Sequence, residues 1–273
     1  MSIFFKILAL FIILNLNLSC SEKEPEYKKS RFKNVKVTKK ESPAVVISKP
    51  EIIRSFPHNT GHFTQGLLIH NGIIYESTGQ RGFSKLLKID IQSGNKLQEI
   101  PLDDKYFGEG IAVYDEKIYF LTWTSQICFV YDAETLEETN SLTYYTQGWG
   151  LTGDGTYLIM SDGSSFIRYV DPEDFTIIKS IRVKMNGKPV EYLNELEYAN
   201  GLIYANVWMK DHIVAFDPET GIVSKKINMS ELRKNEANNP KAEVLNGIAH
   251  NPSTGNFIVT GKNWENYYEV KLK

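Results

Sequence analysis

A lone carboxylate stands between two glycines at the start of an apolar run, in the stretch Tyr106-Phe107-Gly108-Glu109-Gly110-Ile111. Four other short apolar runs open in a comparable way, each with a polar or aromatic leading residue: Gln65-Gly66-Leu67, Trp149-Gly150-Leu151, Asn194-Glu195-Leu196 and Asn246-Gly247-Ile248. If the five leading residues converge in space, one carboxylate meets amide groups and an indole. Such a set could transfer protons and bind a polar substrate.

A second set of residues ends the next apolar run of each segment: Gly79, Trp123, Gly163, Trp208 and Lys262. We call the five leading residues the first column and these five residues the second column. Phe63 and Phe107 each stand two positions before a leading residue. Aromatic neighbours would remove water from Glu109, and the lost hydration would raise its pKa, so that it could act as acid and base near neutral pH. Lys262 would add a cation or a hydrogen-bond donor.

Each of these residues also has a purely structural interpretation. Glu109 could be a solvated surface charge. The tryptophans, including Trp264, could pack in the core between neighbouring repeats. The amides of Gln65, Asn194 and Asn246 could satisfy buried backbone groups.

The spacing of the segments indicates the fold that would bring them together. The leading residues recur at intervals of roughly 40 to 52 residues, which is typical of a radial repeat with one four-stranded unit per period. We therefore expect an all-β, five-bladed β-propeller, in which the innermost strands converge on the axis. The fifth repeat is one strand short, and an isolated strand-like run at 51–56 should complete it and close the ring.

Several features within the repeats have structural explanations. An aspartate ends each third strand and should bond the backbone of the next turn; these are Asp90, Asp132, Asp171 and Asp217. Cys128 lies within a predicted strand and should be a buried free thiol. Two inserts, 184–193 and 228–245, should lie on one face of the ring and border a pocket. In the second, Ser230 is a candidate N-cap of a short helix.

Composition excludes one class of partner. The chain has 273 residues and a formal charge of −2, which argues against nucleic-acid binding, and its two cysteines are not expected to form a disulfide. Residues 49–273 are predicted to form the catalytic propeller domain, and the protein is expected to be a monomer.

The N-terminal part indicates export. Residues 1–20 have the character of a signal segment, and Ser19-Cys20 resembles a bacterial lipoprotein processing site that would make Cys20 the lipidated residue. An ordinary secretory signal is the alternative. Residues 21–48 are polar and rich in lysine, which predicts a flexible tether. The protein is then expected in the bacterial cell envelope, held to the membrane only through a lipid anchor.

The ordered motifs of the two columns resemble the glutamine cyclotransferase family, the plant and bacterial type of glutaminyl-peptide cyclotransferase. The resemblance extends from about residue 53 to the C-terminus. It rests on these motifs: Phe63-Thr64-Gln65-Gly66-Leu67, Glu76-Ser77-Thr78-Gly79, Phe107-Gly108-Glu109-Gly110, Trp149-Gly150-Leu151-Thr152, Ser161-Asp162-Gly163-Ser164, Asn194-Glu195-Leu196-Glu197, Ala205-Asn206-Val207-Trp208, Leu245-Asn246-Gly247-Ile248-Ala249 and Thr260-Gly261-Lys262-Asn263-Trp264.

The resemblance implies a five-bladed propeller enzyme that converts an N-terminal glutamine of peptides or proteins to pyroglutamate and ammonia. It implies that Glu109 is the catalytic carboxylate. The other residues that fall on the family's pocket positions are Phe63, Gln65, Phe107, Trp123, Trp149, Asn194, Trp208 and Lys262. Asn246, the fifth leading residue, is added to this substrate-binding set.

No cofactor and no metal are expected for this reaction, and the five histidines are not expected to form a zinc site. Two other functions stay open. The chain could be a non-catalytic envelope propeller that scaffolds other proteins, or a propeller lactonase, which would need a metal in its funnel.

Overall fold

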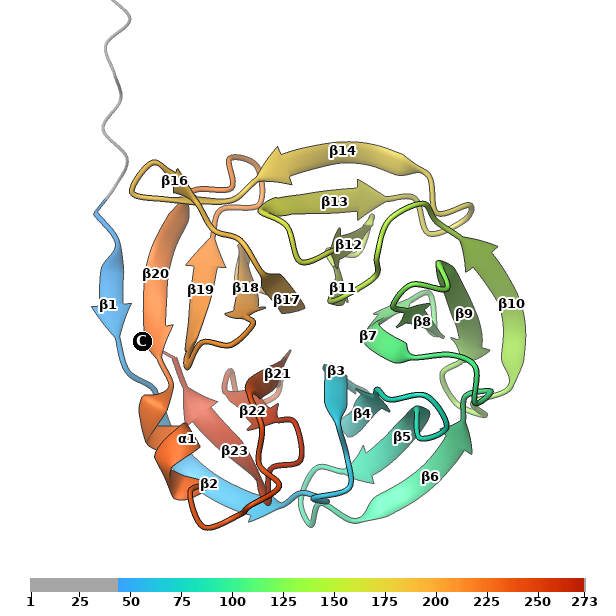
Figure 1. Cartoon of the computed structure of the whole chain (residues 1–273), viewed down its shortest axis with the longest axis horizontal. Helices are drawn as coiled ribbons and strands as arrows, with labels where there is room; N and C mark the ends of the chain where they lie inside the picture. The colour runs from blue at the N-terminus through green and yellow to red at the C-terminus, as the bar shows by residue number, and fades with distance from the viewer. Residues whose placement is uncertain (1–43, 273) are drawn as a thin grey trace, which may run out of the picture. The chain divides into compact units, whose positions relative to one another are not determined.

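Short β-strands separated by turns make up almost all of the computed structural model, which describes residues 44–272. Five of the six sheets in these residues are arranged around a central axis (Figure 1). Within these residues, no helix has the length and apolar character needed to cross a membrane. The expected five-bladed, all-β propeller is confirmed.

Each blade is an antiparallel sheet whose strands follow one another from the axis outward. The first two blades consist of β3 (Thr64–His70), β4 (Ile73–Thr78), β5 (Lys85–Asp90) and β6 (Lys96–Pro101), and of β7 (Gly108–Tyr114), β8 (Lys117–Thr122), β9 (Ile127–Asp132) and β10 (Glu138–Thr143). The third consists of β11 (Leu151–Gly153), β12 (Leu158–Ser161), β13 (Phe166–Val170) and β14 (Ile177–Arg182).

The fourth blade consists of β17 (Leu193–Ala199), β18 (Leu202–Val207), β19 (His212–Phe216) and β20 (Val223–Asn228). The fifth has β21 (Leu245–His250), β22 (Phe257–Gly261) and β23 (Asn266–Lys271), followed by β2 (Glu51–Pro57) as its outermost strand. The inner strands of neighbouring blades are in contact, so their first residues meet around the axis.

The ring is closed by the N-terminal strand, as the sequence predicted. β2 pairs antiparallel with β23, with Ser55 opposite Tyr268 and Phe56 opposite Tyr267. This pairing completes the fifth blade with residues from the other end of the domain, and it covers an edge that would otherwise be open.

The predicted tether differs from the structure at its C-terminal end. Val46–Ser48 form β1, which pairs parallel with β20 on the outside of the fourth blade. These three residues gain backbone hydrogen bonds from the unpaired edge of β20, and local composition gives no sign of that partner. The signal segment, Cys20 and the tether up to residue 43 lie outside the described residues.

The apolar core lies between the blades. Five clusters of buried side chains each join two neighbouring blades. Burying one leucine or isoleucine stabilises the fold by about 1.5–3 kcal/mol, so the blades hold one another in place. Cys128 is a free thiol buried in β9, as expected.

The aspartates at the ends of the third strands have the predicted structural role. Each side chain accepts hydrogen bonds from backbone N–H groups of the following turn, as Asp132 Oδ1 does from Thr135 at 2.8 Å; the others bond Ser93, Glu173 and Thr220.

The two inserts contain the remaining elements. The first forms the hairpin β15 (Lys184–Met185) and β16 (Lys188–Pro189), and the second contains the helix α1 (Ser230–Asn235). The prediction that Ser230 is the N-cap is wrong by one position, because Met229 precedes the first helical residue and makes no side-chain cap. Asn228 Oδ1 instead accepts a hydrogen bond from the Ser230 N–H at 2.9 Å.

Candidate active site

The leading residues are directed to the axis by β-bulges. Four of the inner strands shift register at this point: between Thr64 and Gly66, between Gly108 and Ile111, between Leu193 and Leu196, and between Leu245 and Ile248. A bulge re-aims a side chain that would otherwise alternate with the pleat. In the third blade Trp149 precedes β11 and needs no bulge.

Glycines after the leading residues allow the inner strands to approach closely. A Cβ at Gly110 would lie 2.5 Å from the Leu151 nitrogen, and one at Gly150 would lie 2.1 Å from the Asn194 oxygen. The fourth blade has Glu195 at the equivalent position. Its buried carboxylate accepts backbone hydrogen bonds from Leu67 at 3.2 Å and Ile248 at 2.8 Å, which joins three blades across the axis.

A pocket of about 380 Å³ opens where the two columns meet. Its lining includes nine of the residues predicted for the site: Phe63, Gln65, Phe107, Glu109, Trp123, Trp149, Asn194, Trp208 and Lys262. Every blade contributes to this set, so the ring brings together residues that are far apart in the sequence.

Asn246 is the exception among the predicted residues. It is completely buried and does not belong to the pocket lining; its Nδ2 donates to the Thr64 oxygen at 3.0 Å and to Gln65 Oε1 at 3.4 Å. This placement matches the structural alternative of a buried amide that satisfies backbone groups. Because Gln65 Oε1 takes this bond, the amide nitrogen of Gln65 is the atom left to donate to a ligand.

Aromatic rings form a wall of the pocket in two groups, one of Phe63, Phe107 and Trp123 and one of Trp149 and Trp208. The ring centroids of Phe63 and Phe107 are 6.3 Å apart, those of Phe107 and Trp123 are 5.6 Å apart, and those of Trp149 and Trp208 are 5.8 Å apart, all edge to face. This geometry is favourable for aromatic pairs.

The glycines of the second column make room for these rings. A Cβ at Gly79 would lie 2.4 Å from Phe107, and one at Gly163 would lie 2.7 Å from Trp149. The alternation of glycine and tryptophan in that column is therefore a packing requirement of the wall.

One exposed side chain, which the sequence analysis missed, orients two of the tryptophans. Gln147 Oε1 accepts hydrogen bonds from the indole N–H groups of Trp123 at 2.7 Å and Trp149 at 3.0 Å. Trp264, by contrast, is fully buried in the core between the fourth and fifth blades, as the packing interpretation requires.

Two charged groups of the pocket, Glu109 and Lys262, are buried. Glu109 is 5% exposed, which excludes the surface-charge interpretation, and loss of hydration raises its pKa well above the ordinary value, opposed by the charge of Lys262. Burial lowers the pKa of Lys262, and the charge of Glu109 opposes that shift. The Lys262 Nζ lies 4.5 Å from the ring centroid of Phe63, a cation–π arrangement.

Asn194 has an unused polar atom. Its Oδ1 is buried and has no hydrogen-bond partner in the described part of the chain. Since buried polar atoms are normally satisfied, this oxygen is available for a donor on a ligand.

Three more lining residues were not predicted: Met209, Glu243 and Val244. Glu243 and Val244 belong to the second insert, and the expectation that this insert borders a pocket is confirmed. Met209 directly follows Trp208, so its position beside the second column was the available signal.

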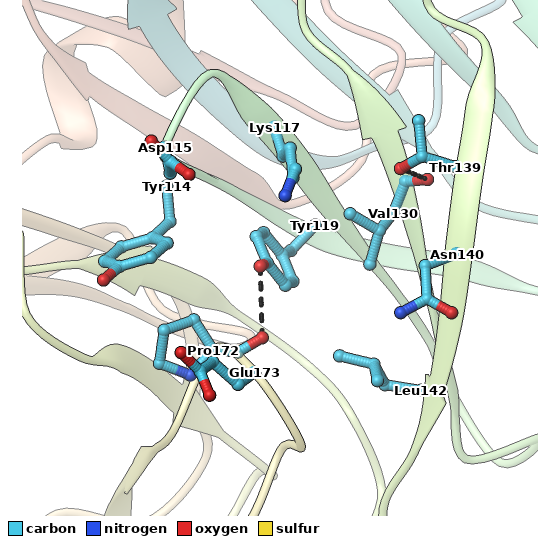
Figure 2. Close-up of a pocket in the computed structure, with 10 residues that line it drawn as sticks. All are labelled: Tyr114, Asp115, Lys117, Tyr119, Val130, Thr139, Asn140, Leu142, Pro172 and Glu173. Carbon is cyan, nitrogen blue, oxygen red and sulfur yellow. Dashed lines mark hydrogen bonds between the residues drawn. The ribbon is translucent and has the colours of Figure 1, made fainter.

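A second pocket of about 480 Å³ lies between the second and third blades (Figure 2). It contains Tyr119, whose hydroxyl donates to the Pro172 carbonyl oxygen at 3.1 Å, and the charged side chains of Asp115, Lys117 and Glu173. Those charged residues are solvent-exposed, and none of the predicted site residues lies here. This pocket therefore lacks a desolvated carboxylate or amine.

The sequence analysis expected no cluster of metal-ligand type, but the fold gathers His58, His62 and Glu76. The Glu76 carboxylate lies 3.0 Å from His58 Nε2 and 2.9 Å from His62 Nδ1, and it also accepts hydrogen bonds from Thr64 at 2.6 Å and Tyr267 at 2.7 Å. Two neighbours per oxygen fill the acceptor sites of this carboxylate. The cluster lies outside the pocket lining and links the strands that close the ring.

Comparison with known proteins agrees with this geometry. The glutamine cyclotransferase family profile matches residues 27–272. Glutaminyl-peptide cyclotransferase of Arabidopsis thaliana is 36% identical over 231 residues, which cover 83% of this chain and 72% of that protein.

Among solved structures, glutaminyl cyclase of Myxococcus xanthus superposes with a TM-score of 0.79 at 38% identity, covering 84% of this chain and 98% of that one. The chain therefore belongs to the glutamine cyclotransferase family, and it is a transferase of the acyltransferase class built on a five-bladed β-propeller.

Proposed function

We propose that this glutamine cyclotransferase closes the N-terminal glutamine of peptides or exported proteins in the pocket around Glu109, which acts as both general base and general acid. The observation that carries the proposal is the burial of one carboxyl group among aromatic rings and polar donors. A scaffold would have no need of a desolvated acid in its funnel, so the scaffold alternative is not favoured.

The reaction forms one bond and breaks another. The substrate's α-amine attacks its own side-chain amide carbon, a C–N bond forms, and the original amide nitrogen leaves as ammonia. Because the α-amine has a pKa of about 7.7–8.0, roughly a tenth or more of it is already neutral at pH 7. The leaving nitrogen needs a proton, and Glu109 can take one from the attacking amine and deliver it there.

Negative charge develops on the amide oxygen during the attack. Lys262 and the amide nitrogen of Gln65 are the candidate donors to this oxygen, and the unpartnered Oδ1 of Asn194 is suited to accept from the substrate's amine. Loss of one such donor typically reduces the rate by about a hundredfold.

The aromatic wall has a separate task. The rings of Trp123, Trp149 and Trp208 can hold the aliphatic part of the glutamine in its folded-back conformation and keep water from the amide carbon. Ring closure then outcompetes hydrolysis.

Glu109→Gln is the decisive variant. It preserves size and polarity but cannot exchange protons, so ammonia release from a Gln-initiated peptide should fall by at least about a thousandfold while the thermal melting temperature is retained. Glu243→Gln changes an exposed carboxylate of the same lining and should reduce kcat by less than about tenfold. An equal loss of cyclisation rate in both variants would contradict the role of Glu109 as general base and general acid.

The proposed chemistry requires no metal. Dialysis against EDTA should leave cyclisation unchanged, whereas a propeller lactonase that depends on a metal would lose its activity. Loss of cyclisation that is restored by adding back a divalent cation would contradict this part of the proposal.

We further propose that the enzyme is a monomer anchored in the cell envelope by a lipid on Cys20. The sequence around Ser19-Cys20 supports the anchor. Cys20→Ser should move the enzyme from the membrane fraction to the soluble fraction without changing its kcat, and size-exclusion chromatography of residues 44–273 should give the mass of one chain.

A further inference from the structure

Three large side chains form an exposed ledge at the pocket mouth. The exposed fractions are 53% for Tyr192, 38% for Trp208 and 62% for Met209. The ledge is continuous with the pocket, because Trp208 and Met209 belong to its lining and the Trp208 ring lies 5.8 Å from that of Trp149 and 5.9 Å from that of Tyr192. Aromatic surface therefore extends from the half-buried Trp149 through Trp208 and Tyr192 to solvent.

Two of these residues have an unusual backbone conformation. Tyr192 has a φ of 65° and Met209 a φ of 63°, in the left-handed region that favours glycine. Met209 is the third residue of a turn in which the Lys210 N–H donates to the Val207 oxygen at 3.0 Å, a position normally occupied by glycine or asparagine. Large apolar side chains are thus held at positions where glycine would be less strained.

Hydrogen bonds fix this arrangement. The Tyr192 N–H donates to the Gly163 oxygen at 2.8 Å, and the Trp208 N–H donates to the Tyr192 oxygen at 2.9 Å. The end of the first insert is therefore attached to the third blade and to the end of β18. The ledge is preorganised, so a bound group need not order it.

We propose that the ledge of Tyr192, Trp208 and Met209 receives the side chain of the second residue of the substrate, and that the enzyme prefers peptides in which a large apolar residue follows the N-terminal glutamine. The inference rests on the proposed function. Both reacting groups of the glutamine must lie in the pocket beside Glu109, so the chain that continues from its carbonyl carbon leaves through the mouth. There it meets the ledge directly.

The test compares Gln-Gly-amide, Gln-Leu-amide and Gln-Phe-amide. Amides are used so that no terminal carboxylate faces Glu243, which lines the mouth. The contact of an aromatic pair corresponds to about a two- to tenfold effect, so kcat/KM for the phenylalanine and leucine peptides should exceed that for the glycine peptide by this factor. The difference should appear mainly in KM.

The double variant Tyr192→Gly, Met209→Gly removes the ledge and leaves Trp208 in the wall. Glycine suits the left-handed backbone at both positions, so the variant should be at least as stable as the parent chain. It should lose the preference because kcat/KM falls more for the two apolar peptides than for Gln-Gly-amide. Ile178→Ala, an exposed apolar change on the outer strand β14, is the matched control and should keep the preference.

Each outcome decides the inference. Equal kcat/KM for the three peptides in the parent enzyme, or an equal loss for all three in the double variant, would overturn the ledge as a specificity site while leaving the cyclase function standing. If no glutamine peptide is cyclised, the proposed function itself fails and the ledge inference fails with it.

Discussion

Glu109 and Lys262 are buried in the same pocket, and burial drives their pKa values toward each other. The pKa of Glu109 is raised and that of Lys262 is lowered, because each loses hydration of its charged form, while each charge partly offsets the shift of the other. The proton affinities of the two groups are therefore closer to each other in this pocket than they are in water.

This relationship predicts the pH dependence of Lys262→Met. Glu109 must be ionised to accept a proton, so kcat/KM should rise with pH through its raised pKa. Removing the ammonium group takes away the charge that lowers this pKa, so the rising limb should move to higher pH. The substitution also removes a donor, which should reduce kcat by about a hundredfold.

The pH–rate profile separates the two effects. Titration of the substrate's amine affects the profile of every variant in the same way. A difference between two profiles therefore reports ionisation of a group on the enzyme. Lys262→Arg keeps the charge and should keep the limb where it is. A limb that does not move in Lys262→Met would show that the two groups are not coupled.

Gly163→Ala should displace Trp149 from the pocket wall. The added methyl group would lie 2.7 Å from the indole, and the position has a φ of 81°. We expect KM to rise by about tenfold. Separately, the free energy of unfolding should fall by about 1–2 kcal/mol, because alanine is strained in the left-handed region. Gly155→Ala is the matched control, because its φ is 87° but its Cβ would lie in open space. It should be destabilised to a similar extent and keep its KM.

Gln147 is predicted to position two indoles without touching the reacting atoms. Gln147→Leu removes the shared acceptor of Trp123 and Trp149, so KM should rise by about fivefold, a loss equal to one hydrogen bond of about 1 kcal/mol, with a smaller change in kcat. The near-UV circular dichroism of the indoles should change as well. Gln147→Glu retains an acceptor oxygen and should keep the spectrum of the parent chain. If this variant shows the same spectral change as Gln147→Leu, the hydrogen bonds to the indoles are not what positions them.

Glu76→Gln should weaken the closure of the ring. It removes the charge from a buried carboxylate that contacts both His58 and His62, a type of change that costs about 3–5 kcal/mol. Urea unfolding measures the loss. Glu269→Gln, which breaks the partly exposed pair with Arg54 between β2 and β23, should cost about 1 kcal/mol or less.

The pH dependence of this loss follows from the pKa shifts. The pKa of Glu76 is lowered by the two histidines despite the opposing effect of its burial, so its stabilisation is present above its unfolded value and is lost as pH falls. The pKa of His62 is raised by Glu76 against desolvation, so its contribution is lost as pH rises through the folded value. The difference between the parent chain and Glu76→Gln should be largest at about pH 5 to 6.5.

The sequence by itself determined the propeller and most of the pocket. Repeated segments, each opening with a residue such as Gln65 or Glu109, predict blades, and the symmetry of a ring requires equivalent positions to meet at the axis. The missing strand of the fifth repeat likewise predicted the closure by β2.

Only the tertiary structure decided the roles of several individual residues, because these roles depend on contacts between blades. The repeat pattern in the sequence does not reveal such contacts. The tertiary structure placed Asn246 outside the pocket lining, in a hydrogen bond to Gln65. It also brought Gln147 into hydrogen bonds with two indoles from different blades. It also gathered His58, His62 and Glu76. A repeat pattern fixes which residues are equivalent, but burial and hydrogen bonding differ among equivalent positions because each blade meets different neighbours.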